Sequence, residues 1–273
     1  LGVALFMFLL YRRFVVARDQ KVEIEEKNKH ITDSIQYAKR IQDAILTSEQ
    51  DMKDALGDYL VYYQPKEIVS GDFYWAYKIN NEKVMLAVAD SSGQGVPGAF
   101  LGMIGTALLN EIVIENGVSD VAEVLEKMQN QLGKKLLNIP DADSREANKI
   151  KLSLVCLNKA TKKLEFVGAG QSLYLVRNSS LSETYGNEHP IGFSSDTTIN
   201  YSRKEIQLEA GDLLCLSTDG AINQLGKQLF VELLEGSTNR TMKEQNEQLD
   251  IACNKAAKTN ASKDDACILG VRI

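Results

Sequence analysis

The sequence predicts an α+β fold in which antiparallel sheets are covered by helices. Short apolar runs are separated by turn-forming pairs such as Asn80-Asn81 and Asn158-Lys159, as in hairpin-connected strands. Long amphipathic segments interrupt these runs in groups and do not alternate with single strands, which disfavours a parallel doubly wound sheet. The chain has 273 residues, 44% of them apolar, which is enough to bury one large core.

The individual elements follow from local patterns. Apolar runs predict strands at residues 59–63, 84–89, 152–157, 163–167, 173–176, 204–208, 212–217 and 266–271. Apolar residues at spacings of three and four predict helices over residues 98–115, 121–137 and 242–259. Asp120 directly precedes the second of these helices and supplies the side chain expected at a helix N-cap.

The N-terminal segment, residues 1–16, is expected to be the C-terminal part of a transmembrane helix. Leu1 to Leu10 are apolar, and Arg12 and Arg13 follow them. Ten apolar residues are too few to cross a bilayer, which takes about 20, so the span would begin upstream of Leu1. Basic residues after the span place the remainder in the cytoplasm, at the inner (cytoplasmic) membrane. The alternative is an apolar helix that packs on the following domain.

Residues 17–56 are expected to form a helical signalling linker, and the domain proper is expected over residues 57–273. The linker is highly charged, and Ile31, Ala38 and Ile45 fall seven residues apart. This spacing fits a short two-stranded coiled coil, hence a homodimer, or a helix that docks on its own domain. A solvated linker helix remains the third alternative.

Composition excludes several classes of function. The net charge of −6 and the absence of a basic stripe argue against nucleic acid as a partner. The four cysteines have no CxxC spacing and are typical of small core residues in a reducing compartment. With two histidines and no nucleophile elbow, a hydrolase triad is not expected.

Aspartates stand at the ends of apolar β-like runs and predict a metal centre. Asp72, Asp90, Asp219 and Asp264 each occupy such a position. A carboxylate at the end of a buried strand is poorly hydrated and needs a counter-charge. Several carboxylates without a cysteine or histidine cluster favour hard divalent cations such as Mg²⁺ or Mn²⁺. Two such ions side by side are a common device for attack of water on a phosphoryl group.

The segment Ala89-Asp90-Ser91-Ser92-Gly93-Gln94-Gly95-Val96-Pro97-Gly98 is the most specific motif. A strand delivers Asp90, glycines allow an unusual turn, and a helix is expected to begin near Pro97. Such a turn can present a carboxylate and a main-chain carbonyl to one ion. The Walker lysine and the GxGxxG spacing of nucleotide-binding loops are both missing.

Other motifs occur in a fixed order around this segment: Ser70-Gly71-Asp72-Phe73-Tyr74-Trp75, Leu109-Asn110-Glu111-Ile112-Val113, Gly168-Ala169-Gly170-Gln171-Ser172-Leu173-Tyr174-Leu175, Pro190-Ile191-Gly192, Ser217-Thr218-Asp219-Gly220 and Asp264-Asp265. Together with them, this segment resembles the SpoIIE-type, RsbU-like branch of the PPM (phosphatase 2C-like) metal-dependent serine/threonine phosphatases. The resemblance covers approximately residues 57–273.

The resemblance implies a fold and a site. The fold would be a four-layer αββα sandwich, two antiparallel sheets flanked by helix pairs. Asp90 would bridge two Mn²⁺ or Mg²⁺ ions, one of them also bound by the Ser91 carbonyl. Asp219 and Asp264 would hold the first ion and Asp72 the second. A metal-bound hydroxide would hydrolyse phosphoserine or phosphothreonine on a partner protein similar to an anti-sigma-factor antagonist, under the control of the N-terminal membrane or sensor region.

The chain departs from the family pattern at three places. Gln94 stands where many relatives have histidine, and Asn148-Lys149-Ile150-Lys151 replaces an Asp-Gly-Met-Asp signature. After Asp219-Gly220, relatives continue with Asp-Gln-Phe-Gly-Gly, whereas this chain has the shorter loop Asn223-Gln224-Leu225-Gly226. These departures motivate an alternative function, a weak or inactive pseudophosphatase that serves as a phosphoprotein-binding scaffold. A hydrolase of small phosphoesters is a third possibility, although no base- or sugar-recognition motif supports it.

Overall fold

The computed structural model of this protein describes residues 2–137, 141, 147–192, 199–259 and 264–273. The chain falls into two units, residues 1–41 and residues 42–273. Helix α1 (Gly2–Ile45) supplies the described residues of the first unit and continues to Ile45.

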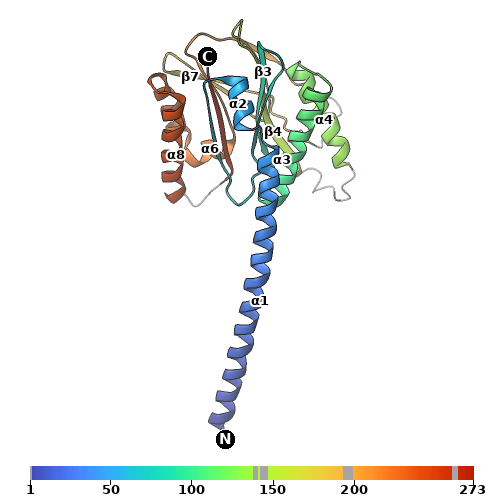
Figure 1. Ribbon diagram of the computed structural model, residues 1–273, viewed down its shortest axis with the longest axis vertical. Helices are drawn as coiled ribbons and strands as arrows, with labels where there is room; N and C mark the ends of the chain where they lie inside the picture. The colour runs from blue at the N-terminus through green and yellow to red at the C-terminus, as the bar shows by residue number, and fades with distance from the viewer. Residues whose placement is uncertain (1, 138–140, 142–146, 193–198, 260–263) are drawn as a thin grey trace. The chain divides into compact units, whose positions relative to one another are not determined.

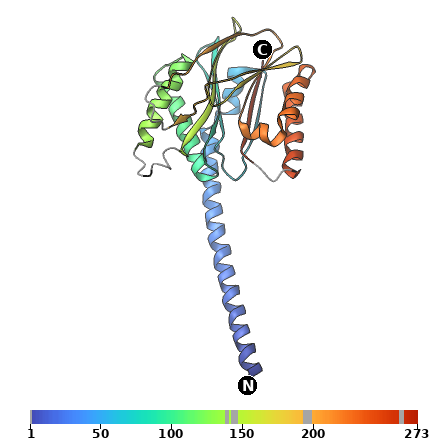
Figure 2. The ribbon, with the colours of Figure 1, turned by 180° about the vertical axis from the view of Figure 1, so that it is seen from behind.

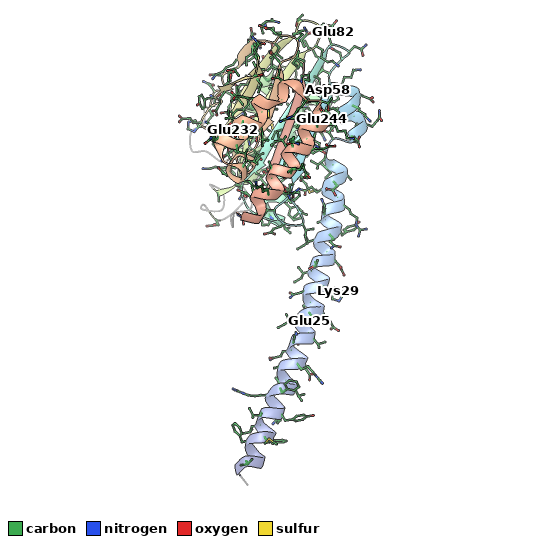
Figure 3. All side chains as sticks on the ribbon, turned by 90° about the vertical axis from the view of Figure 1, so that its left-hand side faces the viewer. Glu25, Lys29, Asp58, Glu82, Glu232 and Glu244 are labelled. Atoms are coloured by element: carbon green, nitrogen blue, oxygen red, sulfur yellow. The ribbon has the colours of Figure 1, made fainter. Side chains whose placement is uncertain are left out.

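Exposed ion pairs lie along the first unit beyond its apolar N-terminal turns. Lys21 and Glu25 are 3.7 Å apart, and Glu23 and Lys27 are 2.7 Å apart, both at the i,i+4 spacing that stabilises exposed helices. Figure 3 shows Glu25 and Lys29 on this helix. This part of α1 therefore carries its own helix-stabilising pairs.

The second unit contains two antiparallel sheets. The first has the order β1-β11-β10-β6-β7, and the second has the order β2-β3-β4-β5-β9, with β8 also paired to β4. The strands are β1 (Tyr59–Gln64), β2 (Phe73–Lys78), β3 (Lys83–Ser91), β4 (Lys149–Asn158), β5 (Lys163–Ala169), β6 (Leu173–Arg177), β7 (Ser180–Thr184), β8 (Ile191–Gly192), β9 (Lys204–Gln207), β10 (Leu213–Ser217) and β11 (Ala266–Arg272).

Helices cover the outer faces of both sheets (Figures 1 and 2). On the side of β3 and β4 lie α3 (Val96–Leu109), the π-helix η1 (Asn110–Glu115) and α4 (Val121–Leu136), and on the other side lie α6 (Asp219–Leu225), α7 (Lys227–Glu235), the 3-10 helix η2 (Gly236–Asn239) and α8 (Met242–Thr259). The short helix α2 (Glu49–Leu56) precedes β1. This arrangement confirms the predicted four-layer α+β sandwich.

Alternating residues of the central strands build three apolar layers. In β3, Val84 and Leu86 face the other sheet, whereas Met85 and Ala87 face α3 and α4. In β11, residues 267, 269 and 271 join the layer between the sheets, and residues 266 and 268 join the layer under α6, α7 and α8. Both faces of these strands are buried, so they appear in the sequence as continuous apolar runs.

Several predicted boundaries differ from the observed ones. The helical linker expected to run to residue 56 breaks after Ile45, because the Ser48 side chain caps a new helix by accepting a hydrogen bond from the Asp51 amide. Strand β2 was not predicted, because aromatic residues on both of its faces hide the alternation. The predicted N-cap Asp120 is confirmed, with its carboxylate accepting from the amides of Ala122 and Glu123.

Among the described residues, one helical stretch is long and apolar enough to cross a membrane. It is Val96–Glu115, formed by α3 and η1, and 56% of it is buried within the structure. Leu108, Leu109 and Ile112 pack there against the β2-β3-β4-β5-β9 sheet. Its hydropathy is explained by its place in the core layer.

The turn before β10 depends on a buried ion pair. The Asp212 side chain is 2% exposed, and its oxygens accept hydrogen bonds from Arg177 Nε at 3.0 Å and Nη2 at 2.6 Å. The Glu209 amide donates a third bond to this carboxylate, at 2.8 Å. These contacts fix the start of the strand that leads to Asp219.

The Asp212→Asn variant is expected to lose about 2 kcal/mol of unfolding free energy at pH 7, because Arg177 loses its charged partner. Burial alone would raise the pKa of Asp212, but the hydrogen bonds from Arg177 and the Glu209 amide prevail and lower it. This stabilisation is therefore present above the unfolded-state pKa of about 4 and disappears as the pH falls through the lower folded-state pKa. Urea unfolding at several pH values measures both effects. An Asp212→Asn protein with an unchanged acid dependence would contradict this account.

Candidate functional site

Each sheet contributes two of the predicted aspartates to one end of the sandwich. Asp72 precedes β2 and Asp90 lies near the end of β3, and these strands pair antiparallel with Phe73 opposite Ala89. Asp219 follows β10 and Asp264 precedes β11, which pair in the same way. A start and an end meet at the same end of each antiparallel pair. The hydrogen bond from Thr218 to Asp72 and the ion pair between Lys151 and Asp219 join these ends of the two sheets, so all four aspartates gather there. Asp264 stands at the start of the last strand, as the sequence predicts, and Asp72 likewise precedes β2.

Asp72 is a buried carboxylate held from the opposite sheet. Its side chain is 2% exposed, and Thr218 donates a hydrogen bond of 2.6 Å from Oγ1 to its Oδ2 atom. Burial raises the pKa of Asp72 well above its usual range, and the nearby charge of Asp90 raises it further, against the opposing effect of the Thr218 hydrogen bond. Asp72 is thus a buried carboxyl group whose ionised form is disfavoured by burial and by the neighbouring carboxylates.

Asp90 lies among the other carboxylates at the end of β3. Burial raises its pKa to about 6; the charge of Lys151 opposes this shift, and the charges of Asp219 and Asp264 add to it. A cation placed among these groups would relieve their repulsion and favour the ionised form of Asp90. The electrostatics of the site therefore favour a bound cation.

The glycine-rich turn after Asp90 has the geometry expected from its sequence. Gly93 and Gly95 have positive φ angles of 92° and 62°, and α3 begins at Val96 with Pro97 in its first turn. The Ser91 amide donates to the Gly71 carbonyl at 3.3 Å, which links the turn to the segment before β2. The Ser91 Oγ atom is buried without a hydrogen-bond partner.

Asp219 forms an ion pair with a residue of the other sheet. It is the first residue of α6, and its Oδ2 atom lies 2.5 Å from Nζ of Lys151 on β4. The two side chains are 46% and 41% exposed, so this pair is open to solvent. Lys151 therefore provides a positive charge next to a predicted metal ligand.

Asp264 and Asp265 have different roles despite being neighbours. Asp264 is exposed, and its Oδ1 atom accepts a hydrogen bond from the Asp265 amide at 3.0 Å. Asp265 is buried, and its carboxylate accepts 2.7 Å hydrogen bonds from the amides of Lys66 and Gly71. Asp265 thus holds the segment before Asp72 in place, whereas Asp264 keeps oxygen atoms available for a ligand.

The donor chemistry of the site fits a hard divalent cation. Every predicted ligand offers oxygen: the carboxylates of Asp72, Asp90, Asp219 and Asp264 and the carbonyl of Ser91. No three histidine, cysteine, aspartate or glutamate side chains within the described ranges form a ready-made ion-binding cluster. The ligand set remains a prediction, and Asp219 would have to exchange Lys151 for an ion.

Two supporting residues were not predicted from the sequence. Thr218 holds Asp72, and Asp265 holds the backbone at Gly71. Both lie in motifs that the resemblance uses, Ser217-Thr218-Asp219-Gly220 and Asp264-Asp265. Of the family departures, Gln94 is exposed on the turn, whereas Lys151 contacts the site directly.

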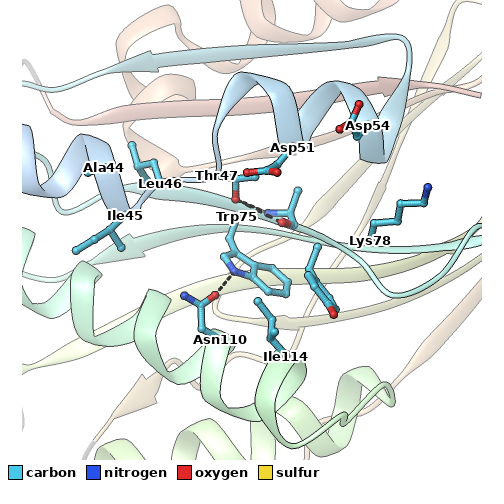
Figure 4. Close-up of a pocket in the computed structure, with 12 residues that line it drawn as sticks. Ala44, Ile45, Leu46, Thr47, Asp51, Asp54, Trp75, Lys78, Asn110 and Ile114 are labelled. Atoms are coloured by element: carbon cyan, nitrogen blue, oxygen red, sulfur yellow. Dashed lines mark hydrogen bonds between the residues drawn. The ribbon is translucent and has the colours of Figure 1, made fainter.

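A cavity of about 510 Å³ lies elsewhere in the second unit, between α2, β2 and η1 (Figure 4). Trp75 lines it and donates a 2.8 Å hydrogen bond from Nε1 to Asn110 Oδ1. Asp51 and Lys78 are also among its lining residues. It is lined by different residues from the aspartate cluster.

Comparisons with known proteins agree with this architecture. The family model described as "Stage II sporulation protein E (SpoIIE)" matches residues 80–273. Phosphoserine phosphatase RsbP of Bacillus subtilis is 20% identical over 214 residues, which cover 78% of this chain and 51% of RsbP. The chain therefore spans about half the length of this relative.

Solved structures show the same fold. The SiaA-PP2C domain of Pseudomonas aeruginosa is 27% identical, with a TM-score of 0.79 and coverage of 90% of this chain and 98% of that one. RsbX, solved in complex with magnesium, has a TM-score of 0.59 at 19% identity. The match covers 79% of this chain and 94% of the RsbX chain.

Proposed function

Since this chain belongs to the stage II sporulation protein E (SpoIIE) family, we propose that it is a metal-dependent phosphatase that hydrolyses phosphoserine or phosphothreonine on a regulatory partner protein. The observation that carries the proposal is the gathering of Asp72, Asp90, Asp219 and Asp264 from two sheets at one end of the sandwich. Their mutual repulsion and oxygen chemistry call for cations at that place.

Each residue has a proposed role in holding the metal. Asp90 would contact two Mn²⁺ or Mg²⁺ ions, with the Ser91 carbonyl, Asp219 and Asp264 on the first and Asp72 on the second. When bound, such ions supply an activated water molecule and neutralise charge on phosphoryl oxygens. Thr218 orients the Asp72 carboxylate through its hydrogen bond.

The substrate class has a direct test. The full chain with Mn²⁺ is expected to release phosphate from a phosphoserine peptide much faster than from a phosphotyrosine peptide or a nucleoside monophosphate. Released inorganic phosphate measures all three reactions under the same conditions. A preference for the nucleotide would replace this proposal by hydrolysis of small phosphoesters.

The Lys151–Asp219 ion pair favours a second candidate, a pseudophosphatase that binds a phosphoprotein without turning it over. In that case the chain would bind divalent ions or the phosphorylated partner but release no phosphate. The partner in either case would be a regulatory protein similar to an anti-sigma-factor antagonist.

The N-terminal unit is proposed to gate the domain. Residues 1–16 would anchor the chain in the cytoplasmic membrane, with the catalytic domain in the cytoplasm. Helix α1 would pair with that of a second copy through the residues spaced by seven, among them Ile31 and Ala38; Ile31 is 57% exposed. Rearrangement of the paired helices would shift the domain between metal-poor and metal-competent states. Light scattering of the full chain in detergent should give the mass of two chains, and the mass of one chain would contradict the pairing.

A further inference from the structure

Lys151 lies between two of the proposed metal ligands. On β4 it is directly opposite Asp90 of β3, and side chains of such antiparallel pairs emerge on the same face. Its Nζ atom reaches the other sheet and lies 2.5 Å from Oδ2 of Asp219. Lys151 therefore connects the two sheets at the end where the carboxylates gather.

The stem of the Lys151 side chain passes close to a glycine on its way to Asp219. Gly170, in the turn between β5 and β6, has a positive φ of 73°, and a Cβ atom there would lie 3.1 Å from Cγ of Lys151. The bare glycine thus leaves room for the lysine stem beside the turn. A side chain at position 170 would crowd the Lys151 stem that carries the ammonium group to Asp219.

From this placement we propose that Lys151 acts as a tethered cation. Its ammonium group pairs with the Asp219 carboxylate when metal is absent and competes with a divalent ion for that carboxylate. The inference rests on the metal centre of the proposed function. The pair is solvent-exposed, at 41% and 46% for the two side chains, so an ion can displace the ammonium group. Lys151 would then set the metal concentration at which the site fills, and would act as a positioning residue.

A direct role with substrate is the competing interpretation. An ammonium group near the site could contact phosphoryl oxygens and leave metal affinity unchanged. Because the two roles differ in the absence of substrate, metal binding alone distinguishes them.

The test is calorimetric titration of Mn²⁺ into the full chain without substrate, for the wild type, Lys151→Met and Lys149→Met. Lys149 lies two residues away on the same strand and is exposed, so its replacement removes the same charge from the same strand. We expect Lys151→Met to tighten Mn²⁺ binding on the order of tenfold, because a unit charge at salt-bridge distance from a ligand is removed. Lys149→Met should stay close to the wild type.

Two further variants keep the test decisive if Lys151→Met fails to fold. Lys151→Arg retains the charge and should bind Mn²⁺ no more tightly than the wild type, whereas Lys151→Gln should bind it more tightly. Equal affinities for wild type, Lys151→Met and Lys151→Gln would overturn the inference. An equal gain in Lys149→Met, or no Mn²⁺ binding by any variant, would also overturn it.

The result can be separated from the fate of the proposed function. Tighter Mn²⁺ binding in Lys151→Met without phosphate release by any variant would support the tethered cation and refute the phosphatase. Turnover with unchanged metal affinity, accompanied by a higher KM in Lys151→Met, would support the phosphatase and assign Lys151 to substrate binding.

Discussion

The Asp90→Asn variant is expected to lose phosphatase turnover by on the order of 1000-fold or more, because the residue proposed to contact both ions loses its charge. The fold should survive. Burial and neighbouring carboxylates raise the pKa of Asp90 to about 6, so the carboxylate is still mostly ionised at neutral pH, and its charge lowers the stability of the metal-free folded state. Asparagine removes that charge, and thermal unfolding with a chelator present should show a midpoint at or above that of the wild type.

Asp250→Asn is the matched control for this prediction. Asp250 is an exposed residue of α8, one of the outer helices. Its replacement by asparagine makes the same change in charge outside the aspartate cluster. Its turnover should equal that of the wild type. Steady-state phosphate release at saturating Mn²⁺ measures both variants, and Asp90→Asn activity within tenfold of the wild type would rule out the proposed role.

The Gly220→Ala variant is expected to lose about 3 kcal/mol of unfolding free energy and most of its activity. A Cβ atom on Gly220 would lie 1.9 Å from the backbone carbonyl oxygen of Asp265. That backbone cannot retreat cheaply, because the Asp265 side chain is bonded to the amides of Lys66 and Gly71. Relief of the clash must move α6 away from β11, and this separates Asp219 from Asp264.

Gly133→Ala is the control for added volume. Gly133 lies within α4, and a Cβ atom there would have its nearest neighbour, the Gly192 carbonyl oxygen, at an ordinary 3.7 Å. Alanine in a helix should raise the unfolding free energy by up to about 1 kcal/mol. Urea unfolding compares the two variants, and similar midpoints for both would show that the close approach at Gly220 carries no such cost.

The sequence predicted most of the sandwich because its central strands are buried on both faces. Continuous apolar runs such as Val84–Ala89 and Leu213–Ser217 lie in β3 and β10, where they were expected. The order of the motifs then predicted which strand ends carry the aspartates. Strands at the margins, such as β7, were missed because half-exposed polar residues there do not produce a clear pattern.

The contacts within the site could not be predicted from local pattern. Thr218 and Asp72 are 146 residues apart, and Lys151 and Asp219 are 68 residues apart. Each pair joins segments from different sheets, so it exists only after the sandwich has formed. Lys151 was identified from the sequence only as part of a departure from the family pattern, because its pairing with Asp219 depends on the three-dimensional arrangement of β4 and α6.

The most direct measurement of the central claim is p-nitrophenyl phosphate hydrolysis by the full chain as Mn²⁺ is titrated, beside Asp90→Asn. A metal-dependent phosphatase should show a rate that rises from background with Mn²⁺, returns to background with excess chelator, and is absent from the Asp90→Asn protein. A folded wild-type chain that hydrolyses nothing at any Mn²⁺ concentration, or an Asp90→Asn protein that matches it, would contradict the claim.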